Sequence, residues 1–105
     1  MCHMKPSEIL AAAREIQCLG HYKGAAARDA NGKDVPLMSA KAVSFCMVGS
    51  VRRVGRGSVL DAENILRRSL GTVGIVEVND APDFTHLDAV EAFERAILLA
   101  RSEEQ

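Results

Sequence analysis

The sequence predicts a mainly α-helical fold: one compact domain of four helices, with a small β-hairpin between helices 1 and 2. Three observations lead to this prediction. The chain has 105 residues, which suits a single hydrophobic core. Aromatic residues make up only 4% of a chain that is 48% apolar, so aliphatic side chains must fill the interior. Apolar residues also recur at helical spacing in four segments. We expect residues 1–5 and 102–105 to be frayed.

The first helix is predicted over Ser7–Leu19. Pro6 stands at its entrance, its apolar residues follow the three-and-four spacing of one helix face, and Gly20 is placed to end it.

The segment after Gly20 predicts the β-hairpin. It has no helical stripe, and its Asn31-Gly32 dipeptide readily adopts the backbone angles of a tight turn. The expected arms are Ala25–Arg28 and Lys33–Val35, and Pro36 closes the second arm.

The second helix is predicted over Ala40–Val54, with Ser39 as its N-cap. It is apolar around most of its circumference, which is typical of a central helix. Gly49 in its interior costs about 1 kcal/mol relative to Ala, so we expect another backbone, that of a crossing helix, to approach there.

The last third of the chain predicts two more helices, over Val59–Leu70 and from Thr85 onward. Thr85 and Asp88 have the spacing of a capping box. The intervening residues 72–78 are rich in β-branched side chains and could form one short strand near residue 75.

The composition narrows the class of protein. The longest apolar run, Ala42–Val51, is shorter than the roughly twenty residues that cross a bilayer. The N-terminus lacks the apolar core of a signal peptide. The three cysteines do not form a disulfide framework, which favours a reducing compartment. We therefore expect a cytoplasmic protein that does not bind a membrane and needs no cofactor.

Asn79 and Asp80 are the first candidate for a binding site. An amide and a carboxylate on an ordered turn can bind a ligand hydroxyl, an amine or a partner backbone. The alternative is an Asx turn, in which these side chains hold the bend before Pro82.

The loop from His21 to Asp34 is the second candidate surface, with His21, Lys23 and Asp29 as its binding residues. A small enzyme or ligand-binding protein would use Asp29, Asn79 and Asp80 in a shared pocket, with His21 as a proton carrier. The pair Cys18 and His21 has a spacing too loose for a zinc site, so we expect no metal.

The arginines form the third candidate surface. Arg52, Arg53 and Arg56 flank a glycine-containing connector, and such a patch can neutralise phosphates. The alternative is a solvated helix end whose cations face the negative end of the helix dipole. Without interleaved aromatic residues, nucleic-acid binding is the weaker reading.

Three stretches carry a resemblance to an uncharacterised family of small bacterial and phage proteins: HYKGAAARDANGKDV, SFCMVGSV and VEVNDAPDFTHLDAVEAFERAILLA. The resemblance covers about residues 7–101. It implies no established activity, and its spread in phages suggests a host-defence or anti-defence role. The positions that it marks are Gly24, Asp29, Gly32, Cys46, Gly49, Asn79, Asp80 and Thr85.

The sequence as a whole favours a noncatalytic interaction protein that binds a macromolecule and could inhibit it. A protein is the expected partner, with no catalytic residues assigned. An apolar central helix in so short a chain leaves homodimer formation open. The small enzyme and the nucleic-acid-binding protein are the alternatives.

Overall fold

The computed structural model describes residues 4–55, 57–71 and 74–104. The predicted mainly helical fold is confirmed, with a fifth helix and a differently placed sheet. The described residues form, in order, α1 (Pro6–Leu19), β1 (Ala27–Arg28), β2 (Ser44–Phe45), α2 (Met47–Val54), α3 (Val59–Leu70), α4 (Ile75–Asn79) and α5 (His86–Glu103).

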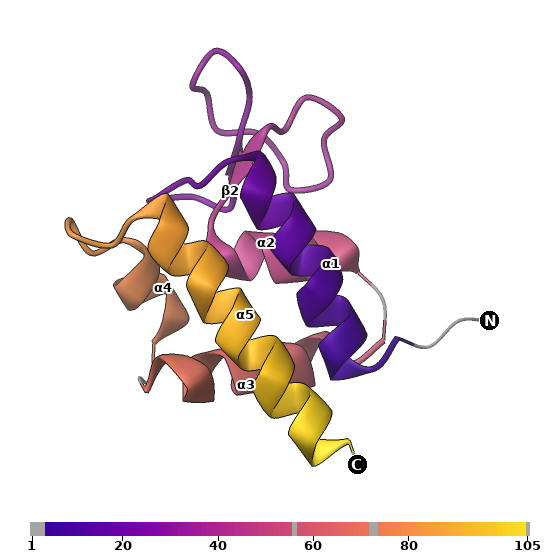
Figure 1. Cartoon of the computed structure of the whole chain (residues 1–105). Helices are drawn as coiled ribbons and strands as arrows, with labels where there is room; N and C mark the ends of the chain where they lie inside the picture. Colours follow the sequence, from indigo (N-terminus) through magenta and orange to yellow (C-terminus); the bar gives the residue numbers. More distant parts are fainter. Residues whose placement is uncertain (1–3, 56, 72–73, 105) are drawn as a thin grey trace.

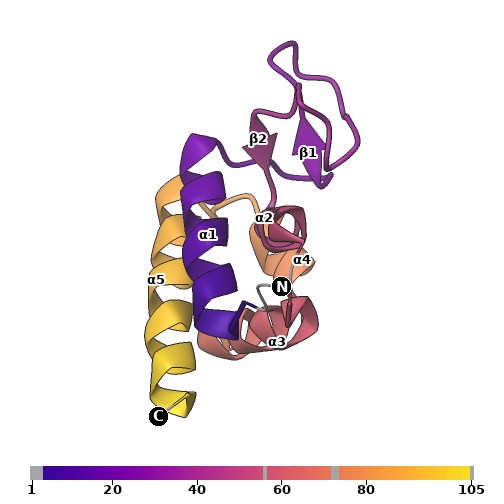
Figure 2. The ribbon, with the colours of Figure 1, turned by 90° about the vertical axis from the view of Figure 1, so that its right-hand side faces the viewer.

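The helices form two layers around one hydrophobic core. α1 and α5 lie side by side and run in opposite directions (Figure 1). Figure 2 shows this pair on one side of the molecule and α2, α3 and α4 on the other, with the small sheet at one end. The chain is compact, with a radius of gyration of 12.9 Å.

All five helices contribute to the core, and α5 contributes mostly alanines. Small side chains let the backbone of α5 approach its neighbours closely, so a core with few aromatic residues still packs densely. The largest core side chains are those of Phe93, Ile9, Leu10, Met47 and Leu66, all with no exposed surface.

The predicted first helix is confirmed as α1. Pro6 occupies its first position, and the Lys5 N–H donates to Glu8 Oε1 at 2.8 Å. Gly20 follows the helix because of a close approach: a Cβ at this position would lie 2.8 Å from the Cβ of Ser44.

The predicted hairpin is only partly correct. The turn around Asn31-Gly32 forms, and Arg28 and Asp34 make one isolated antiparallel bridge across it. The ordered strand pair, however, joins β1 to β2, which we predicted to lie inside the second helix. The β2 backbone finds partners on two segments: Phe45 N–H donates to Gly20 O at 2.9 Å, and Val43 N–H donates to Arg28 O at 2.9 Å.

The second helix is therefore shorter than predicted, because residues 40–46 turn and then join the sheet. Its N-cap is Cys46 rather than Ser39, and the Cys46 sulfur accepts from Gly49 N at 3.2 Å. The expected backbone approach at Gly49 is confirmed, although the neighbour is not a helix. A Cβ on Gly49 would lie 2.4 Å from the carbonyl oxygen of Ala26, just ahead of β1.

The predicted strand near residue 75 is wrong. Residues 75–79 form α4, in which Asp80 N–H donates to Val76 O at 2.9 Å. β-Branched residues have only a weak preference for strands, and packing overrides it here. Helical spacing places Ile75 and Asn79, four residues apart, on the one buried face of α4.

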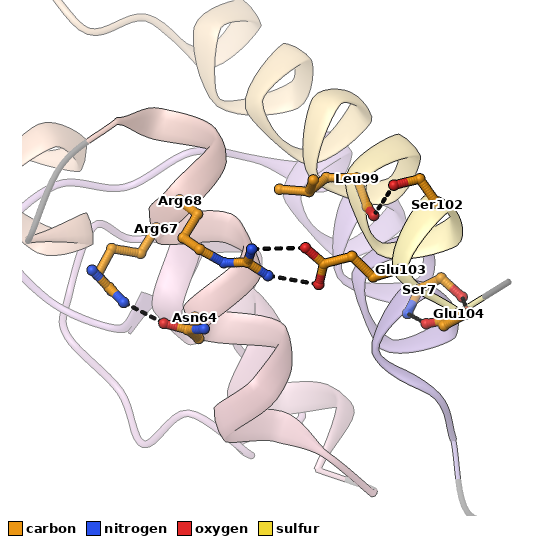
Figure 3. Close-up of polar contacts among 8 residues, drawn as sticks. All are labelled: Ser7, Asn64, Arg67, Arg68, Leu99, Ser102, Glu103 and Glu104. Carbon is orange, nitrogen blue, oxygen red and sulfur yellow. Dashed lines mark hydrogen bonds and ion pairs between the residues drawn. The ribbon is translucent and has the colours of Figure 1, made fainter.

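The capping box of the last helix is confirmed. Asp88 N–H donates to Thr85 Oγ1 at 3.1 Å, and Thr85 N–H donates to Asp88 Oδ2 at 2.9 Å. The helix continues to Glu103, and the next residue, Glu104, binds α1. Its carboxylate accepts from Ser7 N at 3.0 Å and from Ser7 Oγ at 2.6 Å (Figure 3).

Candidate functional site

Asn79 is a buried clamp between three segments. Its side chain is 1% exposed and uses both ends of the amide. Oδ1 accepts from Met47 N at 3.0 Å, which satisfies a donor in the first turn of α2. Nδ2 donates to Tyr22 O and to Asp80 Oδ1, both at 3.0 Å. The amide therefore holds the segment after α1 against α2 and α4.

Asp80 extends this clamp to the surface. Its Oδ1 also accepts from Gly24 N at 3.0 Å, and the neighbouring Lys23 ammonium donates to the carbonyl oxygen of Ala81. The structure thus brings Lys23 to Asn79 and Asp80, which lie more than fifty residues later in the sequence. Their bonds account for the order of the 22–24 segment.

His21 lies beside the clamp in a network centred on Gln17. Gln17 Nε2 donates to His21 Nδ1 at 3.0 Å and to Phe45 O at 3.2 Å. His21 Nδ1 must then accept, so the proton sits on Nε2. Nε2 is buried and has no hydrogen-bond partner within the described residues. The ring also stacks against His86, with the centroids 6.1 Å apart.

These surroundings disfavour the charged form of His21. Burial lowers the pKa of His21 below 6.5. The backbone of Asn79 opposes this effect, and the charge of His86 adds to it. The half-buried imidazole of His21 is therefore uncharged at neutral pH.

Asp29 lies apart from this group and holds its own turn. Its Oδ1 accepts from Asn31 N at 2.9 Å and from Lys33 N at 3.0 Å. This is the bonding of an Asx turn. The enzyme alternative requires four residues to meet at one cavity: His21, Asp29, Asn79 and Asp80. They do not, because Asp29 is bound within its own turn.

The arginines of the predicted basic patch are engaged within the chain. Arg52 makes a two-bond ion pair with Glu63 of α3, at 2.9 and 3.3 Å. Arg53 donates to the carbonyl oxygens of Leu37 and Ser39, and its guanidinium lies 5.0 Å from the centre of the Phe45 ring. Arg56 lies outside the described residues.

Two further arginines, Arg67 and Arg68, lie on α3 and are also bonded within the chain. Figure 3 shows Arg68 reaching Glu103 of α5, with two bonds of 2.7 Å, and Arg67 bonded to Asn64 on its own helix. The Arg68 guanidinium lowers the pKa of Glu103 by donating hydrogen bonds to its carboxylate.

An open groove of about 450 Å³ runs between α2, α3 and α4. We call it the helical groove. Two of its apolar side chains are strongly exposed: Leu60 at 77% and Val76 at 53%. Its lining residues are Val48, Arg52, Leu60, Glu63, Asn64, Arg67, Gly74, Ile75, Val76 and Glu77.

A second cavity, of about 280 Å³, lies on the other side of Val48, Arg52 and Val76, which line both spaces. We call it the Cys46 pocket. Its remaining lining residues are Gly24, Ala25, Ala26, Leu37, Cys46, Gly49 and Asp80.

The thiol in this pocket is poorly suited to nucleophilic chemistry. Cys46 is 8% exposed, and burial raises its pKa more than the backbone N–H groups of Gly49 and Val48 lower it. The thiol therefore stays protonated at neutral pH and reacts slowly.

Metal and membrane sites receive no support from the described residues. Among them, no three His, Cys, Asp or Glu side chains are grouped to hold a metal ion. Nor does any helix in this part of the chain combine the length and apolar character needed to cross a membrane.

The sequence analysis missed three residues that shape these surfaces. Gln17 carried a usable signal, since it is a polar residue at a core position of the first helix and is fully buried. Leu60 and Val76 carried none, because their exposure follows from how α3 and α4 pack.

Comparison with known proteins matches the chain to one protein family. The model of DUF6197, described as a family of unknown function, matches residues 1–99. No curated protein and no solved structure matches the chain. The match supports the resemblance to an uncharacterised family.

Proposed function

The chain belongs to DUF6197, and we propose that it is a noncatalytic interaction protein that binds a segment of a partner protein in the helical groove. The exposure of Leu60 and Val76 across this groove carries the proposal. Exposed apolar side chains that share a concave surface and are rimmed by polar residues typically mark an interaction site.

The rim of the groove suits a peptide or helix with mixed charge. Arg67 and Arg52 line it together with Glu63 and Glu77, so both signs are present. The ion pair between Arg52 and Glu63 fixes one wall, which reduces the side-chain entropy lost on binding. An amphipathic helix docks in such a groove through apolar anchors spaced by three or four residues.

The enzyme alternative has weaker support. Of its four polar residues only Asp80 lines the Cys46 pocket, while Asn79 is saturated by bonds within the chain. Nucleic-acid binding is also weaker, because Arg52 and Arg53 are committed to partners in the same chain. A host-defence or anti-defence role stays a prediction from the resemblance.

The proposal is tested by affinity capture with matched variants. The double variant Leu60→Lys, Val76→Lys places two charges in the groove. Leu98→Lys is the control, because Leu98 is also an exposed leucine on a helix, at 67%, but lies on α5. We expect a protein that the unmodified chain and Leu98→Lys retain and that the double variant loses.

Binding of the purified partner is then measured by calorimetry. We expect affinity at least about tenfold weaker for the double variant, since two anchors worth more than about 1 kcal/mol each are lost. Equal capture by all three chains, with native circular dichroism, would contradict the groove as the binding surface. A second copy of the chain as the captured protein would assign the groove to homodimer formation.

A further inference from the structure

The Cys46 pocket has apolar walls between two opposite charges. Val48, Val76 and the methyl groups of Ala25 and Ala26 line its sides. Its volume of about 280 Å³ is at the lower limit of small-molecule sites, so its occupant must be small. Such a cavity binds an aliphatic body, and its few polar groups fix the orientation.

Asp80 supplies the negative end of the pocket. Gly24 N and Asn79 Nδ2 both donate to Oδ1. A carboxylate has about four lone-pair sites on its two oxygens, so Asp80 keeps accepting capacity for a further donor. An ammonium group, with three donors and a positive charge, matches that capacity.

Arg52 supplies the positive end. Glu63 takes Nε and Nη2, and within the described residues no bond to Nη1 is formed. A guanidinium has five N–H donors in a fixed fork, so the two on Nη1 can serve a second carboxylate. Its side chain remains 57% exposed, which leaves this edge accessible.

The two charges lie at different levels along α2. Asn79 bonds to Met47 N and so anchors Asp80 near the start of this helix. Arg52 follows Met47 by five residues on the same helix, a rise of about 7 Å at 1.5 Å per residue. This offset along the helix favours a ligand whose two charges lie at its two ends and not on one carbon.

We infer that the Cys46 pocket binds a small linear zwitterion, with its amine at Asp80, its carboxylate at Arg52 and its aliphatic chain against Val48 and Val76. The inference does not depend on the proposed partner segment, although Val48, Arg52 and Val76 line both spaces. Cys46 serves only as a reporter, because a bound ligand would cover its thiol.

Calorimetry on the full chain tests the inference with four probes. ε-Aminocaproate carries both charges at the ends of an aliphatic chain. Hexylamine and hexanoate each carry one charge, and norleucine carries both on one carbon. We expect saturable binding of ε-aminocaproate and at least tenfold weaker binding of the other three. Absence of binding by ε-aminocaproate, or equal binding of norleucine, would overturn the inference.

Variants place the ligand in the pocket. Asp80→Asn keeps an oxygen for Gly24 and Asn79, so the chain should fold, yet it should lose about tenfold in affinity for ε-aminocaproate. Ala26→Leu should fill the cavity and abolish binding, whereas Ala40→Leu, at an exposed position outside the lining, should leave it unchanged. Binding that survives both pocket variants would place the ligand elsewhere.

Two further readouts separate this site from the helical groove. Bound ε-aminocaproate should slow alkylation of Cys46 in a chain whose other cysteines are replaced by serine. The groove variant Leu60→Lys should retain zwitterion binding, because Leu60 does not line the pocket. Failure of partner capture would therefore not count against zwitterion binding in the Cys46 pocket. Failure of zwitterion binding would likewise not count against the helical groove as a partner site.

Discussion

The side-chain oxygen of Asn79 lies 3.0 Å from the backbone nitrogen of Met47, a residue 32 positions earlier in the chain. This bond joins α4 to the first turn of α2, and the same amide donates to Tyr22 O. Three segments therefore depend on one buried side chain.

Replacing Asn79 with Ala should destabilise the fold strongly. The substitution leaves the buried Met47 N and the partly buried Tyr22 O without this partner, and an unsatisfied buried group costs about 1–3 kcal/mol. We expect the free energy of unfolding, measured by urea denaturation, to fall by more than about 2 kcal/mol. Asn64→Ala is the control: Asn64 is exposed, and within the described residues its side chain bonds to Arg67 alone, so the change should stay within about 0.5 kcal/mol. Equal losses in the two variants would refute the clamp.

Gly49→Ala should also destabilise the chain, although alanine favours helix. The new Cβ would meet the carbonyl oxygen of Ala26, which cannot move without disturbing the sheet. Overpacking of this kind typically costs about 1–3 kcal/mol, and thermal and urea unfolding should both report it.

Gly74→Ala is the matched glycine control. Its Cβ would meet only the flexible side chain of Glu77, so the cost should stay below about 1 kcal/mol. A stabilised Gly49→Ala variant would mean that the two backbones are farther apart than the structure has them.

The stability of the chain should fall on mild acidification because of His21. Burial lowers the pKa of His21 in the folded chain below the 6.5 of a free imidazole, so the unfolded chain binds the proton more readily. The free energy of unfolding should therefore decrease as the pH falls below 6.5 and continue to decrease until the pH reaches the lowered folded value. Urea unfolding at a series of pH values measures this slope.

His21→Gln should remove that part of the slope, obtained as the difference between the two chains. Other charges face the ring as well: Lys23 and His86 add to the lowered pKa of His21, whereas Asp80 opposes it. His86→Gln should retain most of the slope, because burial is the larger cause. If the free energy of unfolding of His21→Gln fell with pH as steeply as that of the wild type, His21 would not be the cause of the pH dependence.

The link between Glu104 and Ser7 should protect the beginning of α1. The Ser7 N–H belongs to the first turn of the helix, which has no partner within the helix, and Glu104 satisfies it. Glu104→Ala should therefore speed hydrogen exchange at the Ser7 amide. Glu103→Ala is the control, because it breaks the pair with Arg68 and leaves Ser7 bonded.

The contact between Glu104 and Ser7 should also depend on pH, because it requires a charged Glu104 carboxylate. The Ser7 hydroxyl and N–H lower the pKa of Glu104 below 4.5, so the contact stabilises the fold above that value and is lost as the pH falls through the lowered pKa. Protection of the Ser7 amide should decline in this acid range in the wild type. An unchanged exchange rate in Glu104→Ala would show that the contact is not formed in solution.

The helices could be predicted where local signals agree with packing. α1, α3 and α5 each combine an apolar stripe with terminal signals, and their predicted positions match the structure. Residues 40–46 and 75–79 could not be placed in this way. Ser44 and Phe45 lie in a strand and not in the predicted helix, because their backbones pair with β1 and with Gly20. This pairing joins distant segments and leaves no local signal in the sequence.

The candidate sites follow the same division. The sequence singled out Asn79, Asp80 and Lys23 as binding candidates, which stays a prediction. It could not indicate that these residues meet, because their contact depends on the tertiary fold. Asp29, which the sequence suggested as a binding residue, instead forms the bonds of an Asx turn. The helical groove was beyond sequence patterns, since an exposed leucine and a buried one look alike until neighbouring helices are placed.

The pairing of α1 with α5 constrains how the chain can fold during synthesis. α5 is synthesised after α1, yet six of its residues enter the interior and help to cover α1. Until residues 86–103 have left the ribosome, Ile9, Leu10 and Ala13 lack that cover and expose apolar surface. Such nascent chains are prone to aggregate, so we expect acquisition of protease resistance to be delayed until α5 has been synthesised.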